Sequence, residues 1–318
     1  MTIGARRKAI SICIATAGRP AELVRLMESL SAQSVPEDVE VAVIVVDNGP
    51  SQDVFRHPSP PAAGNLKVTV LAETRPGIPF ARNALVRAAL ADGSDYVLFV
   101  DDDEVVEHDW LAHHLRTVDD RQADVVAGPV LPTLPAGAPR WAACSGVFER
   151  PRFETGKVLP WAATGNTLVS TAVFERVSPW FEDRFARTGG SDWEFFRRVA
   201  AEGFTIVWCD EAVAHELLSL DRVTPRWFVR RCLRTGSVRG LETRRAGSAE
   251  VTSGMISGPR AAAVVAAATL LTILEAPRGW RALRRARQAL FHVGVLLGLL
   301  GRAVPEYTTV RRTTDPLA

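Results

Sequence analysis

The sequence predicts an α/β fold with a mostly parallel β-sheet, helices on both of its faces, and a helical C-terminal tail. Short apolar or β-branched runs alternate with segments of helical periodicity from residue 10 to about residue 131. These runs are apolar almost throughout, as is typical of parallel strands that are covered on both faces. Apolar residues make up 47% and charged residues 23% of the 318 residues, a composition that excludes a largely disordered chain.

Five strands are expected along this part of the chain, at residues 10–15, 39–46, 66–72, 96–100 and 124–130. An apolar stripe at helical spacing follows Pro20 and predicts an amphipathic helix; it consists of Leu23, Leu26, Met27 and Leu30. A similar stripe predicts a second helix over residues 80–91. Ligands of such sheets bind at the carboxyl ends of the strands, so the polar residues that follow each strand are the candidate functional residues.

The chain changes character after residue 131. Residues 132–165 mix prolines with aromatic side chains, among them Trp161. This irregular segment is suited either to a binding groove or lid, or to a loop that is pinned by its own aromatic residues. A helix near residues 191–201 and a strand near residues 204–209 follow. We therefore expect three regions, at residues 1–131, 132–220 and 221–318.

The tail is basic and rich in apolar runs. Residues 221–318 carry 17 basic and 6 acidic side chains, whereas residues 1–220 carry 21 and 30. A basic amphipathic helix is expected over residues 224–234, and uncharged runs follow at 261–274 and 289–301. Each run is shorter than the ~20 apolar residues of a spanning helix. We expect interfacial or re-entrant helices at an anionic membrane surface, with a helical hairpin packed on the body as the alternative. A basic turn between the two runs would anchor these helices; its arginines are Arg278, Arg281, Arg284, Arg285 and Arg287.

Cysteine usage and the N-terminus indicate the compartment. The four cysteines are far apart and form no C-x-x-C pair, so neither a disulfide framework nor a zinc site is indicated. The run at residues 10–15 is too short for a signal peptide. We expect the protein at the cytoplasmic face of a membrane, bound peripherally or monotopically. Nucleic acid is not an expected partner, because the basic residues lie among apolar tail segments.

The strongest chemical signal is Asp101-Asp102-Asp103-Glu104, which directly follows the strand expected at residues 96–100. Four consecutive carboxylates repel one another unless a cation neutralises them. Hard oxygen ligands favour Mn²⁺ or Mg²⁺. The motif therefore predicts a divalent metal site, with a solvated acidic turn as the alternative.

Polar residues also follow the other strands. Asp47 ends the strand at residues 39–46 and precedes Asn48-Gly49, which fits either a contact with a nucleoside or a simple turn. Arg19 and Arg75 follow two further strands and are candidates for binding a diphosphate.

A second acidic motif opens the helix expected at residues 191–201. The spacing of Ser191 and Glu194 matches a capping box. Asp192, in the first turn, is stabilised in its ionised form by the helix dipole and could therefore act as a general base. His215 follows a strand-like run and is either a metal ligand or a structural histidine.

These motifs, in this order, resemble the family 2 glycosyltransferases, inverting enzymes with the Rossmann-like GT-A fold, over about residues 11–236. Residues 12–20, Ile-Cys-Ile-Ala-Thr-Ala-Gly-Arg-Pro, resemble the first strand and nucleotide loop of the family. Val46-Asp47-Asn48-Gly49 resembles the base-contacting motif, and Ala81-Arg82-Asn83 the segment before the metal site. Asp101-Asp102-Asp103 resembles the D-x-D signature, and Thr164-Gly165-Asn166 the entry to the acceptor-side strand.

The resemblance implies roles for individual residues. The nucleotide-sugar site would comprise Thr16, Arg19, Asp47, Arg75, Asn83, Asp101 and Asp102. The metal would be held by Asp103 and His215. Asp192 stands at the place of the catalytic base, and Ser191 replaces the usual glutamate before it. Acceptor contacts would come from Trp161, Gly165, Asn166 and Trp193.

The implied activity is inverting transfer from a nucleoside-diphosphate sugar, with a UDP-sugar as the expected donor, to a saccharide in cell-surface or exopolysaccharide biosynthesis. In these terms residues 1–131 form the nucleotide-sugar half and residues 132–220 the acceptor half. The basic tail favours a lipid-linked acceptor. One alternative is a nucleotidyltransferase or sugar-phosphate pyrophosphorylase, although residues 15–19 contain only one glycine. The other is a non-catalytic sugar-nucleotide-binding protein, which only Ser191 favours.

Overall fold

The computed structural model describes residues 6–50, 66–246, 258–275 and 279–305. The chain divides into two compact units. The first unit comprises Met1–Pro135, Glu149–Ala186 and Gly190–Leu218, and the second comprises Ala136–Phe148, Arg187–Gly189 and Ser219–Ala318. The regions expected at residues 1–131 and 132–220 thus both contribute to the first unit, and the segment Ala136–Phe148 belongs with the tail.

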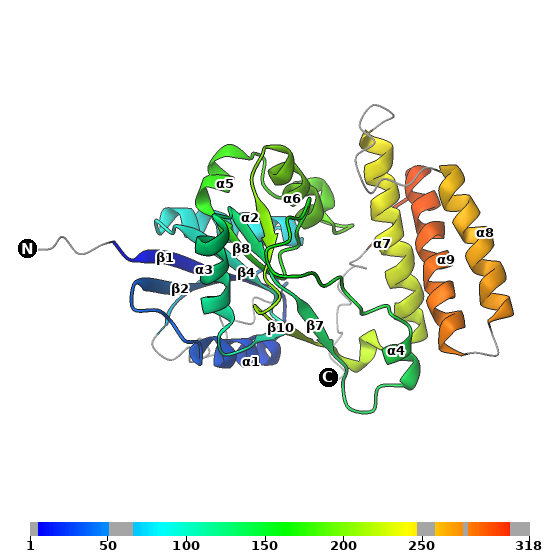
Figure 1. Ribbon diagram of the computed structural model, residues 1–318, viewed down its shortest axis with the longest axis horizontal. Coiled ribbons are helices and arrows are strands. Elements are labelled where there is room, and N and C mark those ends of the chain that lie inside the picture. The colour runs from blue at the N-terminus through cyan, green and yellow to red at the C-terminus, as the bar shows by residue number, and fades with distance from the viewer. Residues whose placement is uncertain (1–5, 51–65, 247–257, 276–278, 306–318) are drawn as a thin grey trace, which may run out of the picture. The chain divides into compact units, whose positions relative to one another are not determined.

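A seven-stranded sheet forms the centre of the first unit, in the order β3-β2-β1-β4-β8-β6-β9 (Figure 1). Its strands are β1 (Lys8–Thr16), β2 (Val39–Asp47), β3 (Lys67–Ala72), β4 (Tyr96–Val100), β6 (Val125–Ala127), β8 (Asn166–Ser170) and β9 (Ile206–Trp208). β8 runs antiparallel to β4 and β6, and the other neighbours are parallel. The predicted mostly parallel sheet is therefore confirmed.

The strand expected at residues 124–130 is wrong in its extent. β6 ends at Ala127, and β7 (Val130–Thr133) joins a second sheet with β5 (Glu104–Val106) and β10 (Ala214–Leu217), in the order β5-β10-β7. The break falls at Gly128-Pro129. Proline has no N–H to continue the hydrogen-bond ladder. The single apolar run therefore forms two strands, β6 in the large sheet and β7 in the small one.

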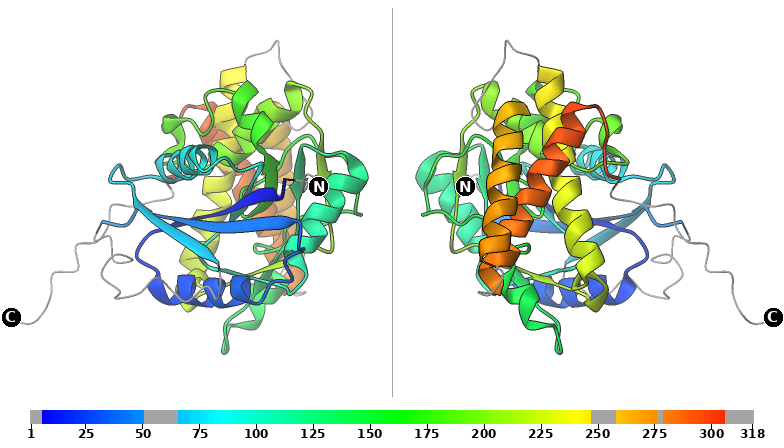
Figure 2. Two further views of the ribbon diagram at one scale, coloured as in Figure 1. Left: turned by 90° about the vertical axis from the view of Figure 1, so that its left-hand side faces the viewer. Right: turned by 90° about the vertical axis from the view of Figure 1, so that its right-hand side faces the viewer.

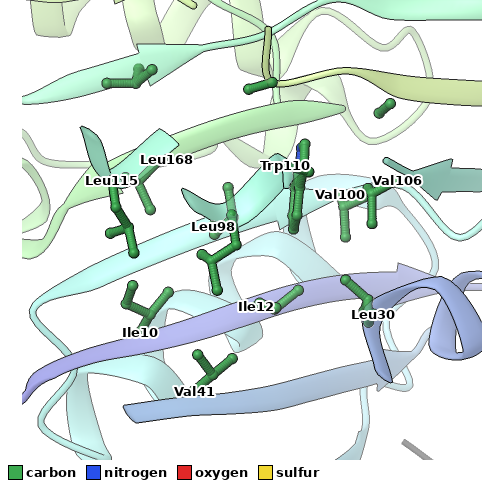
Figure 3. Close-up of a cluster of buried hydrophobic side chains, with 14 of the residues drawn as sticks. Ile10, Ile12, Leu30, Val41, Leu98, Val100, Val106, Trp110, Leu115 and Leu168 are labelled. Atoms are coloured by element: carbon green, nitrogen blue, oxygen red, sulfur yellow. The ribbon is translucent and has the colours of Figure 1, made fainter. Parts of the chain in front are cut away.

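Helices cover both faces of the large sheet. On one face α1 (Pro20–Ser31) and α3 (Trp110–Arg121) enclose one buried cluster, and on the other α2 (Ile78–Ala91), α5 (Thr171–Arg176) and α6 (Ser191–Ala201) enclose a second. Figure 3 shows the first cluster, in which Leu30 of α1 and Trp110 of α3 lie beside sheet residues such as Leu98. The apolar stripe predicted after Pro20 is the buried face of α1.

Three helices make up most of the second unit: α7 (Pro225–Ala246), α8 (Gly258–Leu274) and α9 (Trp280–Leu299). α9 lies between α7 and α8 (Figures 1 and 2). The backbones of α7 and α9 approach closely at Gly236, Gly240, Gly294 and Gly298. A Cβ atom added to Gly294 would lie 2.3 Å from the carbonyl oxygen of Leu233. Two facing G-x-x-x-G stretches thus let the helices meet without intervening side chains.

The tail differs from its prediction in two respects. The helix expected at residues 224–234 continues to Ala246. The arginines between the two uncharged runs form the first half of α9 and not a turn, except Arg278, which lies outside the described residues. No helix in the described ranges has the length and apolar character needed to cross a membrane.

The segment at residues 136–148 is ordered by aromatic contacts within the second unit. It contains the short helix α4 (Arg140–Cys144). Phe148 stacks on Trp227 with ring centroids 5.2 Å apart, and Trp141 meets Phe228 edge-on at 5.9 Å. The aromatic residues of this part of residues 132–165 thus pin it to α7 of the second unit, and not to the first unit as a loop pinned to the body would be. Two short 3₁₀ helices, Asp183–Phe185 and Leu220–Arg222, complete the described elements.

Candidate active site

The acidic motif forms the turn between β4, which ends at Val100, and β5, which begins at Glu104. β1 lies beside β4 in the sheet and ends at Thr16, so its loop meets this turn. The hydroxyl of Thr16 donates a hydrogen bond of 2.7 Å to Asp102 Oδ2. Asp102 and Asp103 are only 5% and 9% exposed. Two neighbouring parallel strands therefore bring Thr16 and the carboxylates together at the carboxyl end of the sheet, where such sheets bind their ligands.

Arg19 supplies positive charge to this turn. Its Nη1 atom lies 3.0 Å from Asp102 Oδ1 and 3.0 Å from Asp103 Oδ2. Arg19 immediately precedes α1, and 41% of its side chain is exposed. Burial raises the pKa of Asp102, and Arg19 and Thr16 oppose that rise. One guanidinium group, which reaches the buried acidic pair from the solvent side, thus offsets part of its negative charge.

Asp101 faces a different arginine. Its Oδ1 atom lies 4.0 Å from Arg82 Nη2, and Arg82 Nη1 also donates to the hydroxyl of Ser191 at 3.3 Å. Loss of solvation at the base of the turn raises the pKa of Asp101, and Arg82 opposes this rise. Arg82 is buried in α2. It therefore links the acidic turn to the N-terminal end of α6, where Asp192 lies.

Gly165 leaves room for three charged side chains. A Cβ atom at Gly165 would lie 3.0 Å from Glu104 Oε1, 3.3 Å from Asp101 Oδ2 and 3.7 Å from an Nη atom of Arg150. Burial raises the pKa of Glu104 well above its usual range, with a further contribution from Asp101. Glu104 Oε1 is buried without a hydrogen-bond partner among the described residues. Two carboxylates and one guanidinium group therefore surround the space that Gly165, which has no side chain, leaves open.

Sequence reasoning missed Arg150 and Glu216, which form an ion pair beside this space. Glu216 pairs in register with Glu104 across β5 and β10. His215 is the preceding residue of β10, and alternate residues of a strand point to opposite faces. The ring of His215 lies 2.9 Å from Glu107 Oε1. This alternation of side chains along a strand ending at Leu217 was the available signal. It could have favoured Glu216 over His215 as the residue beside the acidic turn.

Three predicted nucleotide-sugar residues have well-defined roles within the protein. Asp47 is fully buried, and its Oδ1 atom accepts the N–H of Gly49 at 2.8 Å, which stabilises the turn after β2. Arg75 forms a bidentate ion pair with Glu73 and lies over the ring of Phe80. The side-chain amide of Asn83 both donates to and accepts from the backbone of Phe181. None of these contacts reaches the acidic turn.

The capping box predicted at Ser191 and Glu194 is wrong. α6 is capped by Gly190 without a side-chain hydrogen bond. Glu194 pairs instead with Arg198, and Ser191 Oγ accepts the bond from Arg82. The Oδ1 atom of Asp192 accepts the N–H of Trp193 at 2.9 Å. Asp192 is partly exposed in the first turn of α6.

The predicted acceptor residues differ in how accessible they are. Trp161 and Trp193 are partly exposed. Asn166 is 2% exposed and makes four hydrogen bonds within the protein. Its Oδ1 atom accepts from Trp110 Nε1 and His114 Nε2, and its Nδ2 atom donates to the carbonyl oxygens of Pro129 and Ala212. This geometry favours a structural role for Asn166 between the two sheets.

The ligand atoms available at the acidic turn are suited to a hard divalent cation. They are carboxylate oxygens, one of which, on Glu104, is buried with no hydrogen-bond partner in the described part of the chain. The described residues contain no group of three His, Cys, Asp or Glu residues placed to hold a metal ion. A magnesium-type ion, however, is held by one or two carboxylates together with substrate phosphates. The residues present therefore fit a metal that arrives with a phosphorylated ligand.

Comparison with known proteins agrees with this geometry. Residues 11–178 match the family described as glycosyl transferase family 2. The chain is 30% identical over 321 residues to the succinoglycan biosynthesis protein ExoM of Rhizobium meliloti (strain 1021). That alignment covers 96% of this chain and 97% of the relative.

Two solved structures resemble the fold. The mannosyltransferase PcManGT from Pyrobaculum calidifontis, in complex with GDP-Man and Mn²⁺, gives a TM-score of 0.61 at 18% identity, over 94% of this chain and 89% of that one. Residues 1–349 of TarS from S. aureus, in complex with UDP, give a TM-score of 0.52 at 15% identity, over 92% of both chains. Together with the family match and the mostly parallel sheet, these findings show that the chain belongs to glycosyltransferase family 2, that it has the GT-A fold and that it is a glycosyltransferase.

Proposed function

We propose that this glycosyltransferase moves a sugar from a nucleoside-diphosphate sugar to a saccharide acceptor in exopolysaccharide biosynthesis, with Asp192 as general base. The acidic turn after β4 carries the proposal, because it lies where α/β sheets bind their ligands and its carboxylates are held by Thr16 and Arg19. The succinoglycan biosynthesis protein supports the polysaccharide product by its name. The UDP and GDP-Man in the complexes of the two structural relatives support a nucleotide donor.

Guanidinium groups at the site can neutralise the negative charge of the donor's diphosphate. Arg19, Arg82 and Arg150 all interact electrostatically with carboxylates of residues 101–104. Guanidinium groups bind phosphate oxygens in a bidentate manner. We place the diphosphate at the end of β1, beside Arg19, and the nucleoside near Asp47 on the neighbouring strand. A UDP-sugar remains the first donor to test.

A divalent metal, Mn²⁺ or Mg²⁺, would offset charge on the departing nucleoside diphosphate. Asp103 is the residue that we propose to hold it. Asp101 would then contact the ribose or the transferred sugar. The ring of His215 is hydrogen-bonded to Glu107, so His215 would coordinate the metal only if that hydrogen bond were broken.

Asp192 performs the proton transfer in this proposal. Its carboxylate takes the proton from an acceptor hydroxyl as the hydroxyl oxygen forms a bond to the anomeric carbon. The bond from that carbon to the diphosphate oxygen breaks, and its electron pair leaves with the nucleoside diphosphate. One displacement inverts the anomeric centre. Arg82 fixes the base relative to the turn, because it contacts both Ser191 and Asp101.

The second unit supports a lipid-linked acceptor at a membrane surface. α8 packs against α9 and has no charged residue from Ala261 to Leu274, and its Leu270 is 58% exposed. A recess of about 700 Å³ in the same unit is lined by Arg281, Arg284, Arg285, Arg287, Gln288, Phe291 and Glu275. Exposed apolar side chains next to arginines are typical of helices that bind anionic lipid surfaces. We propose peripheral or monotopic binding at the cytoplasmic face.

Flotation with vesicles tests the membrane proposal. The parent should float with vesicles that contain phosphatidylglycerol, and Leu270→Glu should reduce the bound fraction. Val158→Glu, a change at another exposed apolar residue in the first unit, is the control. Equal flotation of the parent and Leu270→Glu would contradict a role for α8 in binding.

A donor screen tests the proposed activity. The enzyme is incubated with UDP-, GDP-, dTDP- and CDP-sugars, with Mn²⁺ and lipid extract, and release of nucleoside diphosphate is measured. One nucleotide class should be consumed, and consumption should fall in Asp103→Asn. If a folded sample consumes no donor under any of these conditions, nucleotide-sugar transfer is excluded.

A further inference from the structure

The contact between Arg19 and the acidic turn has a consequence for how metal and donor bind. One nitrogen, Arg19 Nη1, lies 3.0 Å from an oxygen of each of two successive carboxylates, Asp102 and Asp103. A divalent cation held by the same carboxylates would occupy similar surroundings, because it also requires negative oxygens from this turn. Two cations that need the same oxygen of Asp103 exclude each other.

We propose that Arg19 is a tethered counter-cation, which competes with the divalent metal for Asp103 and is withdrawn when the donor diphosphate binds. This inference rests on the proposed function, since it takes the ligand to be a nucleoside diphosphate. It makes Arg19 a positioning residue that couples the two ligands.

The other arginines of the site are held differently. Arg82 is bonded to Ser191, and Arg150 is paired with Glu216, so both have partners outside the turn. The hydrogen bonds of the Arg19 guanidinium go to Asp102 and Asp103. Arg19 can therefore leave the turn without breaking a contact elsewhere in the site.

Exposure also favours movement of Arg19. Its side chain is 41% exposed, whereas the side chains of Asp102 and Asp103 are 7% and 11% exposed. Asp102 keeps the 2.7 Å bond from Thr16 when Arg19 moves. Rotation of one solvent-facing side chain thus removes the Arg19 charge from Asp103 while Thr16 still anchors Asp102.

The diphosphate supplies a new partner for the displaced charge. Arg19 lies in the loop after β1, directly before the N-terminus of α1, where phosphate groups are favoured by backbone N–H groups and the helix dipole. When Arg19 pairs with the diphosphate, it no longer competes with the metal for Asp103, and the metal in turn would offset charge on the same diphosphate. Each ligand therefore strengthens binding of the other, and linkage makes the coupling reciprocal.

Titration with Mn²⁺, followed by the EPR signal of the free ion, tests the competition directly. The full-length parent, Arg19→Gln and Arg19→Lys are titrated without nucleotide and then with the nucleoside diphosphate of the consumed donor, or with UDP if no donor is consumed. Arg25→Gln is the matched control, because Arg25 is an exposed arginine of α1 that pairs with Glu22. Thermal unfolding of each variant confirms that it is folded.

Without nucleotide, Arg19→Gln should bind Mn²⁺ roughly tenfold more tightly than the parent, within the usual range of coupling between sites. Arg19→Lys, which keeps the positive charge, and Arg25→Gln should resemble the parent. Added nucleotide should tighten Mn²⁺ binding more in the parent than in Arg19→Gln.

Equal or weaker Mn²⁺ binding by Arg19→Gln in the absence of nucleotide would overturn the competition. So would the absence of Mn²⁺ binding by every variant under both conditions. These outcomes are separate from failure of the proposed function, which is absence of donor consumption by the parent, because the nucleotide-free titration does not depend on a donor.

Discussion

His114 provides a quantitative test of the buried network that joins the two sheets. The side chain is completely buried, and its Nε2 atom lies 2.8 Å from Asn166 Oδ1. Because the amide nitrogen of Asn166 donates to two backbone carbonyls, its oxygen is the acceptor and Nε2 of His114 carries the proton. The Nδ1 atom is buried without a partner in the described part of the chain. A second proton on this ring would therefore have no acceptor.

Burial lowers the pKa of His114 from 6.5 to about 4. The folded protein then binds fewer protons than the unfolded chain between these values, so this residue makes the protein less stable as the pH falls through that window. The difference corresponds to roughly 3 kcal/mol in all, most of which is lost between pH 7.5 and 4.5. Asp101, whose pKa is raised, has the opposite effect, so a comparison of variants is required.

Urea unfolding of the parent and His114→Gln across this pH range isolates the effect. Glutamine can still donate to Asn166 but does not titrate, so the variant should lose less stability than the parent by about 2–3 kcal/mol between pH 7.5 and 4.5. His108→Gln is the control, since His108 is exposed. If the parent and His114→Gln lose the same free energy of unfolding, His114 is not held neutral by this network.

Two further predictions concern the tail and the ion pair beside Gly165. Gly294→Ala should destabilise the second unit by about 1–3 kcal/mol, because its Cβ atom would lie 2.3 Å from a carbonyl oxygen of α7. Thermal unfolding measures this loss. The control is Gly258→Ala, whose Cβ atom would have its nearest contact at 3.8 Å and which should have little effect. Arg150→Gln and Glu216→Gln should each lower turnover of the donor, and the double variant should lose less than the two losses combined because the residues form one ion pair; additive losses would show that they act separately.

Much of the first unit is predictable from sequence because its strands are short apolar runs and its first helix has a clear stripe. The break of β6 from β7 was missed because Val125 and Val130 read as one run, although Pro129 between them cannot continue a ladder. The predicted capping box failed because other partners take both side chains. Ser191 and Glu194 have the right spacing, but Ser191 accepts from the distant Arg82, and Glu194 pairs with Arg198 one turn further along α6.

The candidate site shows the same limit. Carboxylates at strand ends can be recognised from position, which identified Asp101 to Asp103. The pairing of Arg19 with two of them depends on the path of the loop before α1, and the pairing of Arg150 with Glu216 joins residues 66 positions apart. A motif predicted Asn166 as an acceptor residue, yet the four hydrogen bonds of its side chain go to residues at least 37 positions away in the sequence.

The most direct test of Asp192 as the base is a comparison of donor binding and transfer in the Asp192→Asn variant. Asparagine preserves the size and the hydrogen bond from the Trp193 N–H but cannot accept the acceptor's proton. We predict that calorimetry will find donor affinity within about twofold of the parent, while transfer falls by a factor of roughly 10²–10⁴, the usual contribution of a general base. Transfer at the parental rate by a folded Asp192→Asn variant would contradict the proposed mechanism.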